Sequence, residues 1–259
     1  MNDNSIIYLL KRSKQLLDDY YKEIHNSNIH SYLMSNGIFE NDFLPKALLN
    51  ISDESYRYYI DYIITHNTIG VLLNVFSGSG RLIKELKAFD LLSSFSIINN
   101  IDISKNMISF EKKSFCDKNL NFYCNDILNF ENNTITFDIA ICHCGIRYIT
   151  KEKLSKLIHV LLSQKRSNSS RCLVTESNLT AVKLFYKDLN SITSSYTIEK
   201  HIAPVHRNTR LYASIMLYKN SEEFKSIIDS LSSLYFSNSY SVLADISGYK
   251  TVEFFTFIF

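Results

Sequence analysis

Uncharged aliphatic runs alternate with amphipathic segments over residues 67–176. The run at 69–75 consists of β-branched and aliphatic residues, which is typical of a strand buried on both faces of a parallel sheet. Apolar residues then repeat at helical spacing, at Leu82, Ile83, Leu86 and Phe89. Further segments of both kinds follow, with strands predicted at 96–102, 122–127, 137–143 and 171–176 and helices beginning at 104 and at about 151. Strands that alternate with helices predict an α/β fold around a parallel sheet.

A glycine-containing turn, Ser77-Gly78-Ser79-Gly80, separates the first strand of this region from the first helix. In such a turn the backbone N–H groups and the helix N-terminus can receive a ligand, and glycine permits both positive φ and close approach. The third glycine of G-x-G-x-x-G is missing, because Ile83 stands at that position, and no Gly-Lys-Ser/Thr of a Walker A loop follows. For this segment taken alone, a tight turn that binds nothing is an equal alternative.

Two aspartates stand at the ends of the next two predicted strands. Asp102 lies 24 residues after Gly78, near the offset of about 20 residues at which an acid reaches a ribose diol. Ser104 follows as the predicted N-cap of a helix. Asp126 ends the next run, where an aspartate that only caps the following turn is the alternative. If the strands are parallel, both acids and the glycine turn belong to one edge of the sheet.

Together these segments resemble the class I, Rossmann-like, S-adenosylmethionine-dependent methyltransferases over about residues 69–176, with a weaker similarity at 220–259. That family reads Leu-Asp-x-Gly-x-Gly-x-Gly, then Val-Asp-x-Ser-x-x-Met, then an Asp after the third strand and Phe-Asp-x-Val-x at the fourth. The most specific match is Ile101-Asp102-Ile103-Ser104-Lys105-Asn106-Met107-Ile108. Two positions depart from the pattern: Asn74 stands where the family has an acid, and Phe76 where it has its first glycine.

The resemblance implies an α/β fold with a Rossmann-like, doubly wound, mostly parallel seven-stranded sheet, an antiparallel C-terminal hairpin and an N-terminal helical cap. We therefore expect a helical cap or lid at 1–66 and an S-adenosylmethionine-binding domain at 67–259, with a substrate-pocket insertion at about 177–219. In the N-terminal segment the pattern predicts helices at about 5–24 and 53–66 with a turn at Asn36-Gly37, and its many tyrosines favour a lid over a plain cap.

The C-terminal pattern is less regular. It predicts helices at 179–189 and 220–234, and strands at 196–203, 211–218, 240–246 and 251–259. The last two strands would form the closing hairpin around Ser247-Gly248. The alternative takes 196–218 as that hairpin and 220–259 as an appendage.

The cofactor implied by the resemblance is S-adenosyl-L-methionine. Asp102 would accept hydrogen bonds from both ribose hydroxyls, and Asp126 would accept one from the adenine amino group. The residues expected to contact the cofactor are Asn74, Phe76, Ser77, Gly78, Ser79, Gly80, Asp102, Ile103, Met107, Asp126, Ile127, Cys142 and His143.

Catalytic candidates follow the fourth and fifth strands, beside the expected position of the methyl group: His143, Tyr148 and Glu176. A general base is needed only if the nucleophile arrives protonated, and histidine has a pKa suited to that task. Each candidate has a simpler alternative. His143 would line the cofactor pocket, Tyr148 would pack, and Glu176 would cap the next helix.

Composition narrows the substrate. The net charge is only +2 and neither half of the chain is strongly basic, which disfavours a nucleic-acid partner. Cys142-His143-Cys144-Gly145 follows the fourth strand, in place of the Asp/Asn-Pro-Pro-Tyr of enzymes that methylate nucleobase amino groups. We therefore expect a small-molecule substrate, an amino acid or a compound of secondary metabolism.

Five cysteines without framework spacing favour reduced thiols, and their spacing does not fit a zinc site, so no metal is expected. No secretory signal and no apolar run of membrane-spanning length are evident, which predicts a cytoplasmic protein without a membrane partner. The oligomeric state stays open.

Three other functions compete with methyl transfer. Attack at another carbon of the sulfonium would give aminocarboxypropyl transfer or cyclisation with release of methylthioadenosine, and Asn74 in place of the family's acid gives this alternative weight. A binding module without activity is the next alternative. A NAD-dependent dehydrogenase is disfavoured by the missing third glycine.

Overall fold

The computed structural model describes residues 3–25, 43–51, 54–130, 135–206 and 208–259. The predicted turn at Asn36-Gly37 lies outside these ranges. The chain divides into two compact units, Met1–Glu54 with Pro204–Thr251, and Ser55–Ala203 with Val252–Phe259. This division differs from the boundary at 66 and the insertion at 177–219 expected from the sequence, because the chain leaves the second unit within one strand and returns within another.

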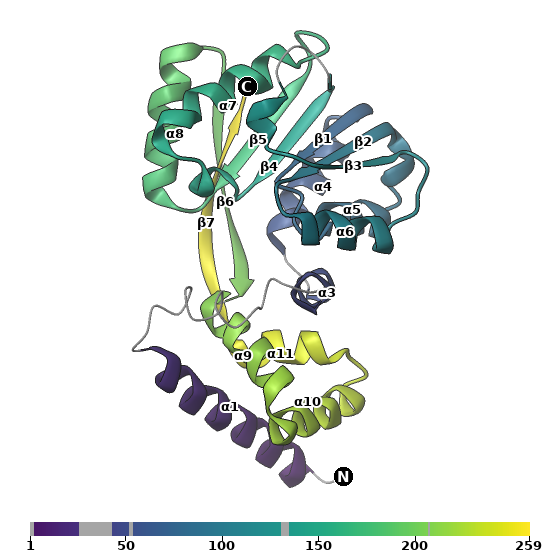
Figure 1. Cartoon of the computed structure of the whole chain (residues 1–259), viewed down its shortest axis with the longest axis vertical. Coiled ribbons are helices and arrows are strands. Elements are labelled where there is room, and N and C mark those ends of the chain that lie inside the picture. Colours follow the sequence, from purple (N-terminus) through teal and green to yellow (C-terminus); the bar gives the residue numbers. More distant parts are fainter. Residues whose placement is uncertain (1–2, 26–42, 52–53, 131–134, 207) are drawn as a thin grey trace. The chain divides into compact units, whose positions relative to one another are not determined.

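A seven-stranded sheet in the order β3-β2-β1-β4-β5-β7-β6 forms the centre of the second unit (Figure 1). Strands β1 to β5 pair in parallel, and β7 pairs antiparallel with β5. The strands are β1 (Gly70–Val75), β2 (Phe95–Asp102), β3 (Leu120–Cys124), β4 (Ile139–His143), β5 (Arg171–Glu176), β6 (Thr197–His206) and β7 (Tyr249–Ile258). The expected α/β class, with a mostly parallel sheet and antiparallel C-terminal pairing, is confirmed.

Helices cover both faces of this sheet (Figure 1). One face carries α4 (Arg57–Thr65), α5 (Arg81–Ala88) and α6 (Lys105–Ser114), and the other carries α7 (Lys151–Ser163) and α8 (Leu179–Ile192). The β1 side chains of Leu73 and Val75 join an apolar core with Leu157 of α7 and Phe185 of α8. Short 3-10 turns complete the unit: η1 (Glu54–Tyr56), η2 (Leu92–Ser94), η3 (Ile127–Asn129) and η4 (Ile146–Tyr148). The central strands β1 and β4 are therefore buried on both faces, as the uncharged run at 69–75 predicted for β1.

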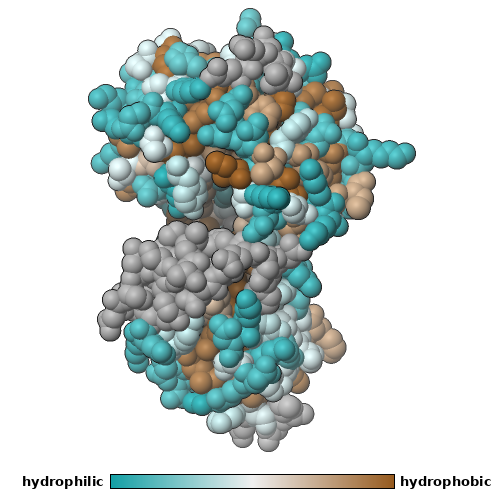
Figure 2. All heavy atoms as spheres, viewed as in Figure 1, coloured by the Kyte–Doolittle hydropathy of each residue, from teal (hydrophilic) through white to brown (hydrophobic). Residues whose placement is uncertain are grey.

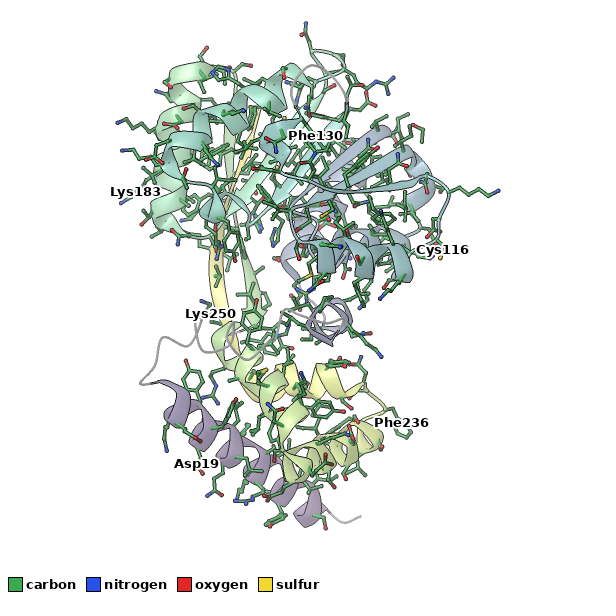
Figure 3. The ribbon with its side chains drawn as sticks, in the orientation of Figure 1. Asp19, Cys116, Phe130, Lys183, Phe236 and Lys250 are labelled. Carbon is green, nitrogen blue, oxygen red and sulfur yellow. The ribbon has the colours of Figure 1, made fainter. Side chains whose placement is uncertain are left out.

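The first unit is helical and has a core of its own. Its described helices are α1 (Asp3–His25), α3 (Phe43–Asn50), α9 (Asn208–Asn220), α10 (Glu222–Leu234) and α11 (Ser239–Ser247). Leu17, Leu44, Phe224 and Leu243 are among the buried residues of that core. Between α10 and α11, the side chain of Phe236 is 98% exposed and projects from the helices (Figure 3).

Two predicted strands of the C-terminal region are wrong, because 211–218 lies in α9 and 240–246 lies in α11. Both runs are mostly apolar, and periodicity cannot separate a buried helix from a buried strand in so short a run. Neither closing hairpin proposed from the sequence forms. The strands predicted at 196–203 and 251–259 are confirmed as β6 and β7, and α9 to α11 stand between them in the sequence.

The visible surface of each unit is mostly hydrophilic, with smaller groups of apolar residues between (Figure 2). Within the described ranges, no helix combines the length and the apolar character needed to cross a membrane.

Candidate functional site

The ends of four parallel strands bring the predicted motifs to one edge of the sheet. Val75 at the end of β1 pairs with Ile101 of β2 and with Cys142 of β4. Asp102 at the end of β2 pairs with Cys124 at the end of β3. The residues that follow these strands therefore lie near one another at this edge, although Cys142 comes 67 positions after Val75 in the sequence.

The turn after β1 has an unusual backbone. Phe76, Gly78 and Gly80 all have positive φ, at 61°, 60° and 82°. At Gly80, the N-cap of α5, a Cβ would lie 2.5 Å from the ring of Phe115, so that any side chain would clash. At Gly78 a Cβ would meet only a carbonyl oxygen of its own turn, at 3.9 Å. Phe115 at the end of α6 thus fills the space beside Gly80, whereas the space beside Gly78 is not filled by another element.

Asp102 is hydrogen-bonded to this turn. Its Oδ2 accepts the N–H of Gly78 at 2.9 Å, and its Oδ1 accepts the N–H of Ser104 at 2.8 Å. Burial raises the pKa of Asp102, against the opposing effect of these two N–H donors. A carboxylate has about four acceptor positions, so two N–H bonds leave further positions for hydroxyl donors. The structure therefore brings together the glycine turn and the first aspartate.

The second aspartate lies close by. Its neighbour Asn125 donates its N–H to the carbonyl of Asp102 at 3.0 Å. The side chain of Asp126 accepts the N–H of Leu128 at 3.0 Å and so caps η3. The capping role foreseen as the alternative for Asp126 is therefore present, and its second carboxylate oxygen is the one that a ligand could use. Ile127, which follows, is buried.

Two apolar residues that follow Asp102 differ in exposure. Ile103 is 72% exposed, and Met107 in the first turn of α6 is partly buried. Ser104 caps α6 by accepting the N–H of Met107, as its place in the sequence predicted. Ile103 thus offers an exposed apolar surface next to the Asp102 carboxylate.

Two expected contact residues point elsewhere. Asn74 is buried and donates its side-chain amide to Oδ1 of Asn100 at 2.9 Å, and Asn100 in turn donates to the carbonyl of Asn121. Cys142 is buried in the apolar core on the α7 and α8 face, where burial raises the pKa of its thiol well above the ordinary value. Asn74 thus bonds to a neighbouring strand of the sheet, and Cys142 packs in the core on one of its faces.

Glu111 of α6 lies beneath the glycine turn, and we did not single it out from the sequence. It is fully buried, and its Oε2 accepts a hydrogen bond from the Ser77 hydroxyl at 2.8 Å. Its Oε1 has no hydrogen-bond partner in the described part of the chain. Burial, opposed by the Ser77 bond and assisted by the charge of Asp102, raises the pKa of Glu111 to about 8. The signal for it was an acid at helical spacing between the apolar residues Ile108 and Phe115.

The turn after β4 packs against the turn after β1. A Cβ on Gly145 would lie 1.9 Å from the Phe76 ring, so the ring packs directly on the glycine. This contact explains how a bulky residue holds a positive φ, which costs free energy unless the surroundings enforce it.

We expect Gly145→Ala to lower the free energy of unfolding by roughly 1–3 kcal/mol, because the new methyl group overlaps the Phe76 ring. Urea denaturation measures the loss. In a chain that already carries Phe76→Ala, the ring is gone and Gly145→Ala should cost much less. Equal costs in the two backgrounds would contradict the packing of these turns.

His143 ends β4 and is held by the N-terminal part of the unit. The Tyr59 hydroxyl lies 2.9 Å from its Nδ1, and the Ser55 hydroxyl lies 3.1 Å from its Nε2. The Tyr56 ring lies against the imidazole, with 4.5 Å between the ring centroids. Tyrosines of the segment predicted as a lid therefore contact a predicted catalytic residue.

The other two catalytic candidates differ in exposure. Tyr148 is 78% exposed. Glu176 is fully buried and ion-paired with Arg147, whose Nε donates to Oε2 at 3.2 Å and whose second guanidinium nitrogen donates to Oε1. The N–H groups of Ser177 and Asn178 also donate to Glu176 Oε1, at 2.8 and 2.9 Å. Through these donors the Glu176 carboxylate joins the loops that follow β4 and β5.

The sequence matches no protein-family model and no curated protein. Among solved structures it is similar to the plantazolicin methyltransferase BpumL in complex with a pentazolic desmethylPZN analog and SAH, at 16% identity over 99% of this chain and 98% of that one, with a TM-score of 0.48. It is also similar to the N-methyltransferase NodS from Bradyrhizobium japonicum WM9 in complex with S-adenosyl-l-homocysteine, at 12% identity over 71% and 94%, with a TM-score of 0.49. A third similar structure is the magnesium protoporphyrin IX methyltransferase ChlM from Synechocystis PCC 6803 with bound SAM. Its sequence is 14% identical over 57% of this chain and 71% of that one, and the TM-score is 0.44. By its strand order, its antiparallel last pairing and the glycine turn after β1, the chain has the Rossmann-like α/β fold that the sequence predicted.

Proposed function

We propose that this protein is a cytoplasmic S-adenosylmethionine-dependent methyltransferase whose acceptor is a small molecule, an amino acid or a secondary metabolite, rather than a nucleic acid. The observation that best supports this proposal is the bond between the Gly78 N–H and the Asp102 carboxylate. It joins the two most characteristic motifs of the sequence at the edge where ligands bind in open α/β sheets.

The residues at this edge fit the cofactor. Gly78 leaves space over its Cα, and Asp102 keeps acceptor positions for a ribose diol. Ile103 offers an exposed apolar surface for one face of the adenine, and Asp126 keeps one carboxylate oxygen for its amino group. When bound, S-adenosylmethionine supplies an electrophilic methyl group on a sulfonium.

The chain's own part in the reaction is alignment, exclusion of water and proton uptake. An acceptor that arrives as N–H or O–H must lose a proton as its bond to carbon forms. His143 at the end of β4 is the residue that we assign to take it. Glu176, held by Arg147 and two backbone N–H groups, serves to position the β4 loop.

We expect Asp102→Ala to weaken binding of S-adenosylhomocysteine by roughly 30-fold or more, since charged hydrogen bonds are worth about 1.5–3 kcal/mol each. Titration calorimetry on the full chain measures the dissociation constant. Asp102→Asn keeps one acceptor oxygen and should lie between the two. Asp19→Ala, at an exposed position of α1, is the matched control and should bind like the unmodified chain. Failure of the unmodified protein to bind either S-adenosylmethionine or S-adenosylhomocysteine would end the proposal.

A second reaction remains a candidate because of Asn74. The amide there brings no negative charge towards the amino-acid end of the cofactor, and it is engaged with Asn100. Aminocarboxypropyl transfer or cyclisation would release methylthioadenosine, whereas methyl transfer releases S-adenosylhomocysteine. Mass analysis of the nucleoside formed from S-adenosylmethionine and a cell extract separates the two.

A further inference from the structure

A row of polar side chains runs across the sheet from the end of β4. His143 is directly opposite Thr175 of β5, and Thr175 is directly opposite Thr256 of β7. Residues directly opposite one another on adjacent strands present their side chains to the same face. Both threonines are fully buried, and their hydroxyls lie 2.7 Å apart. Valine has the same shape and would fill these positions without a polar group to desolvate, so packing alone does not account for two threonines.

Two tyrosines of α4 extend this row at both ends. The Tyr59 hydroxyl lies 2.9 Å from Nδ1 of His143, and Thr175 lies beside it. The Tyr58 hydroxyl lies beside Thr256 and donates to Oε2 of Glu199 at 2.7 Å. Glu199 stands on β6 and is exposed. A series of neighbouring hydroxyls thus leads from Nδ1 of the imidazole to a surface carboxylate.

The chemistry of the members fits proton passage rather than proton storage. Burial raises the pKa of both Tyr58 and Tyr59, which keeps the phenols neutral at physiological pH. A neutral hydroxyl can accept one proton while it gives up another, and it then carries no charge before or after the transfer. The two ends of the row are an imidazole, His143, and a carboxylate, Glu199, which are groups that can take up a proton and release it again.

We propose that Tyr59, Thr175, Thr256 and Tyr58 form a proton relay from Nδ1 of His143 to the carboxylate of Glu199. A proton that reaches Nε2 through the Ser55 hydroxyl, which lies 3.1 Å from that nitrogen, leaves from Nδ1 to the Tyr59 oxygen, and each hydroxyl then passes its own proton to the next. The last one protonates Glu199, which releases it to water. The role of the relay as the exit for the proton that the acceptor loses in methyl transfer rests on the proposed function. Its role as a path for proton exchange between His143 and water does not depend on that function.

The relay is tested on the full-length protein without cofactor, by nuclear magnetic resonance of 15N-labelled histidine. We expect the His143 imidazole to carry its proton on Nδ1, and we measure how fast that proton exchanges with water at neutral pH and low buffer concentration. Thr256→Val and Glu199→Gln should each slow this exchange by roughly tenfold or more. Thr256→Ser, which keeps the hydroxyl, should exchange as fast as the unmodified chain.

Matched control positions are available on β7. Thr251→Val on β7 and Glu253→Gln, also on β7, lie outside the row and should leave the exchange rate unchanged. A merely structural role for Thr256 predicts the opposite sign, because a loosened site opens more often and exchanges faster. Unchanged or faster exchange in Thr256→Val and Glu199→Gln, or an imidazole protonated only on Nε2, would overturn the relay. Since calorimetry with S-adenosylhomocysteine tests the cofactor separately, either idea can fail without the other.

Discussion

We expect Glu111→Gln to stabilise the protein by about 3–4 kcal/mol at pH 9 relative to the unmodified chain, and to change its stability little at pH 5. Burial raises the pKa of this carboxyl from 4.5 to about 8. Between those values the folded chain holds a proton that the unfolded chain has released. The free energy of unfolding therefore falls as pH rises through this window, and it is lowest above the folded pKa. Glutamine keeps the shape and the Ser77 partner but cannot ionise.

Urea denaturation at pH 5, 7 and 9 measures the effect. The control is Glu23→Gln, the same change at an exposed position of α1, which should leave the pH dependence as it is. If the unmodified protein and Glu111→Gln lose or gain stability in parallel from pH 5 to pH 9, Glu111 is not kept neutral in the folded state.

Arg147→Met is expected to lower the free energy of unfolding by about 3–5 kcal/mol, because it leaves the fully buried Glu176 carboxylate without its cation. The loss should shrink when both charges are removed together in Arg147→Met with Glu176→Gln, since an uncompensated charge costs more than an absent pair. Arg147→Lys keeps the charge but not the two-pronged geometry, and its effect should lie between.

Denaturation of the unmodified chain, Arg147→Met, Glu176→Gln and the double variant completes a double-mutant cycle and gives the coupling energy directly. The same variants report on function, because the pair joins the β4 loop to the end of β5. Arg147→Met should therefore also weaken binding of S-adenosylhomocysteine, whereas the double variant should recover part of it. A cycle with no coupling would contradict the pairing.

Much of the sheet unit was predictable from local pattern. The uncharged runs gave the strands, and Ser104 at the start of a helical period gave the N-cap of α6. The approach of Asp102 to Gly78 could also be anticipated, because parallel strands in register leave their carboxyl ends side by side. Asp126 lay where expected, although its capping of η3 was the alternative that we weighed against a ligand role.

The errors and omissions have one physical origin. The apolar runs at 211–218 and 240–246 carry no period that distinguishes a buried helix from a strand, and only their packing in the helical core decides for the helix. Glu111 and Ser77 are 34 residues apart, and Arg147 and Glu176 are 29 apart. Partners at such distances leave no mark in a local pattern.

By itself the sequence determined the strands of the parallel sheet, the glycine turn and the order of the two aspartates, because each depends on neighbouring residues and on the regular geometry of a parallel sheet. Only the tertiary structure decided which polar groups contact one another. Glu111 is hydrogen-bonded to Ser77, Glu176 is ion-paired with Arg147, and His143 stands in register with Thr175, as Thr175 does with Thr256. The environment of a buried charge or hydroxyl is set by side chains from other elements, and these are fixed only when the chain has folded.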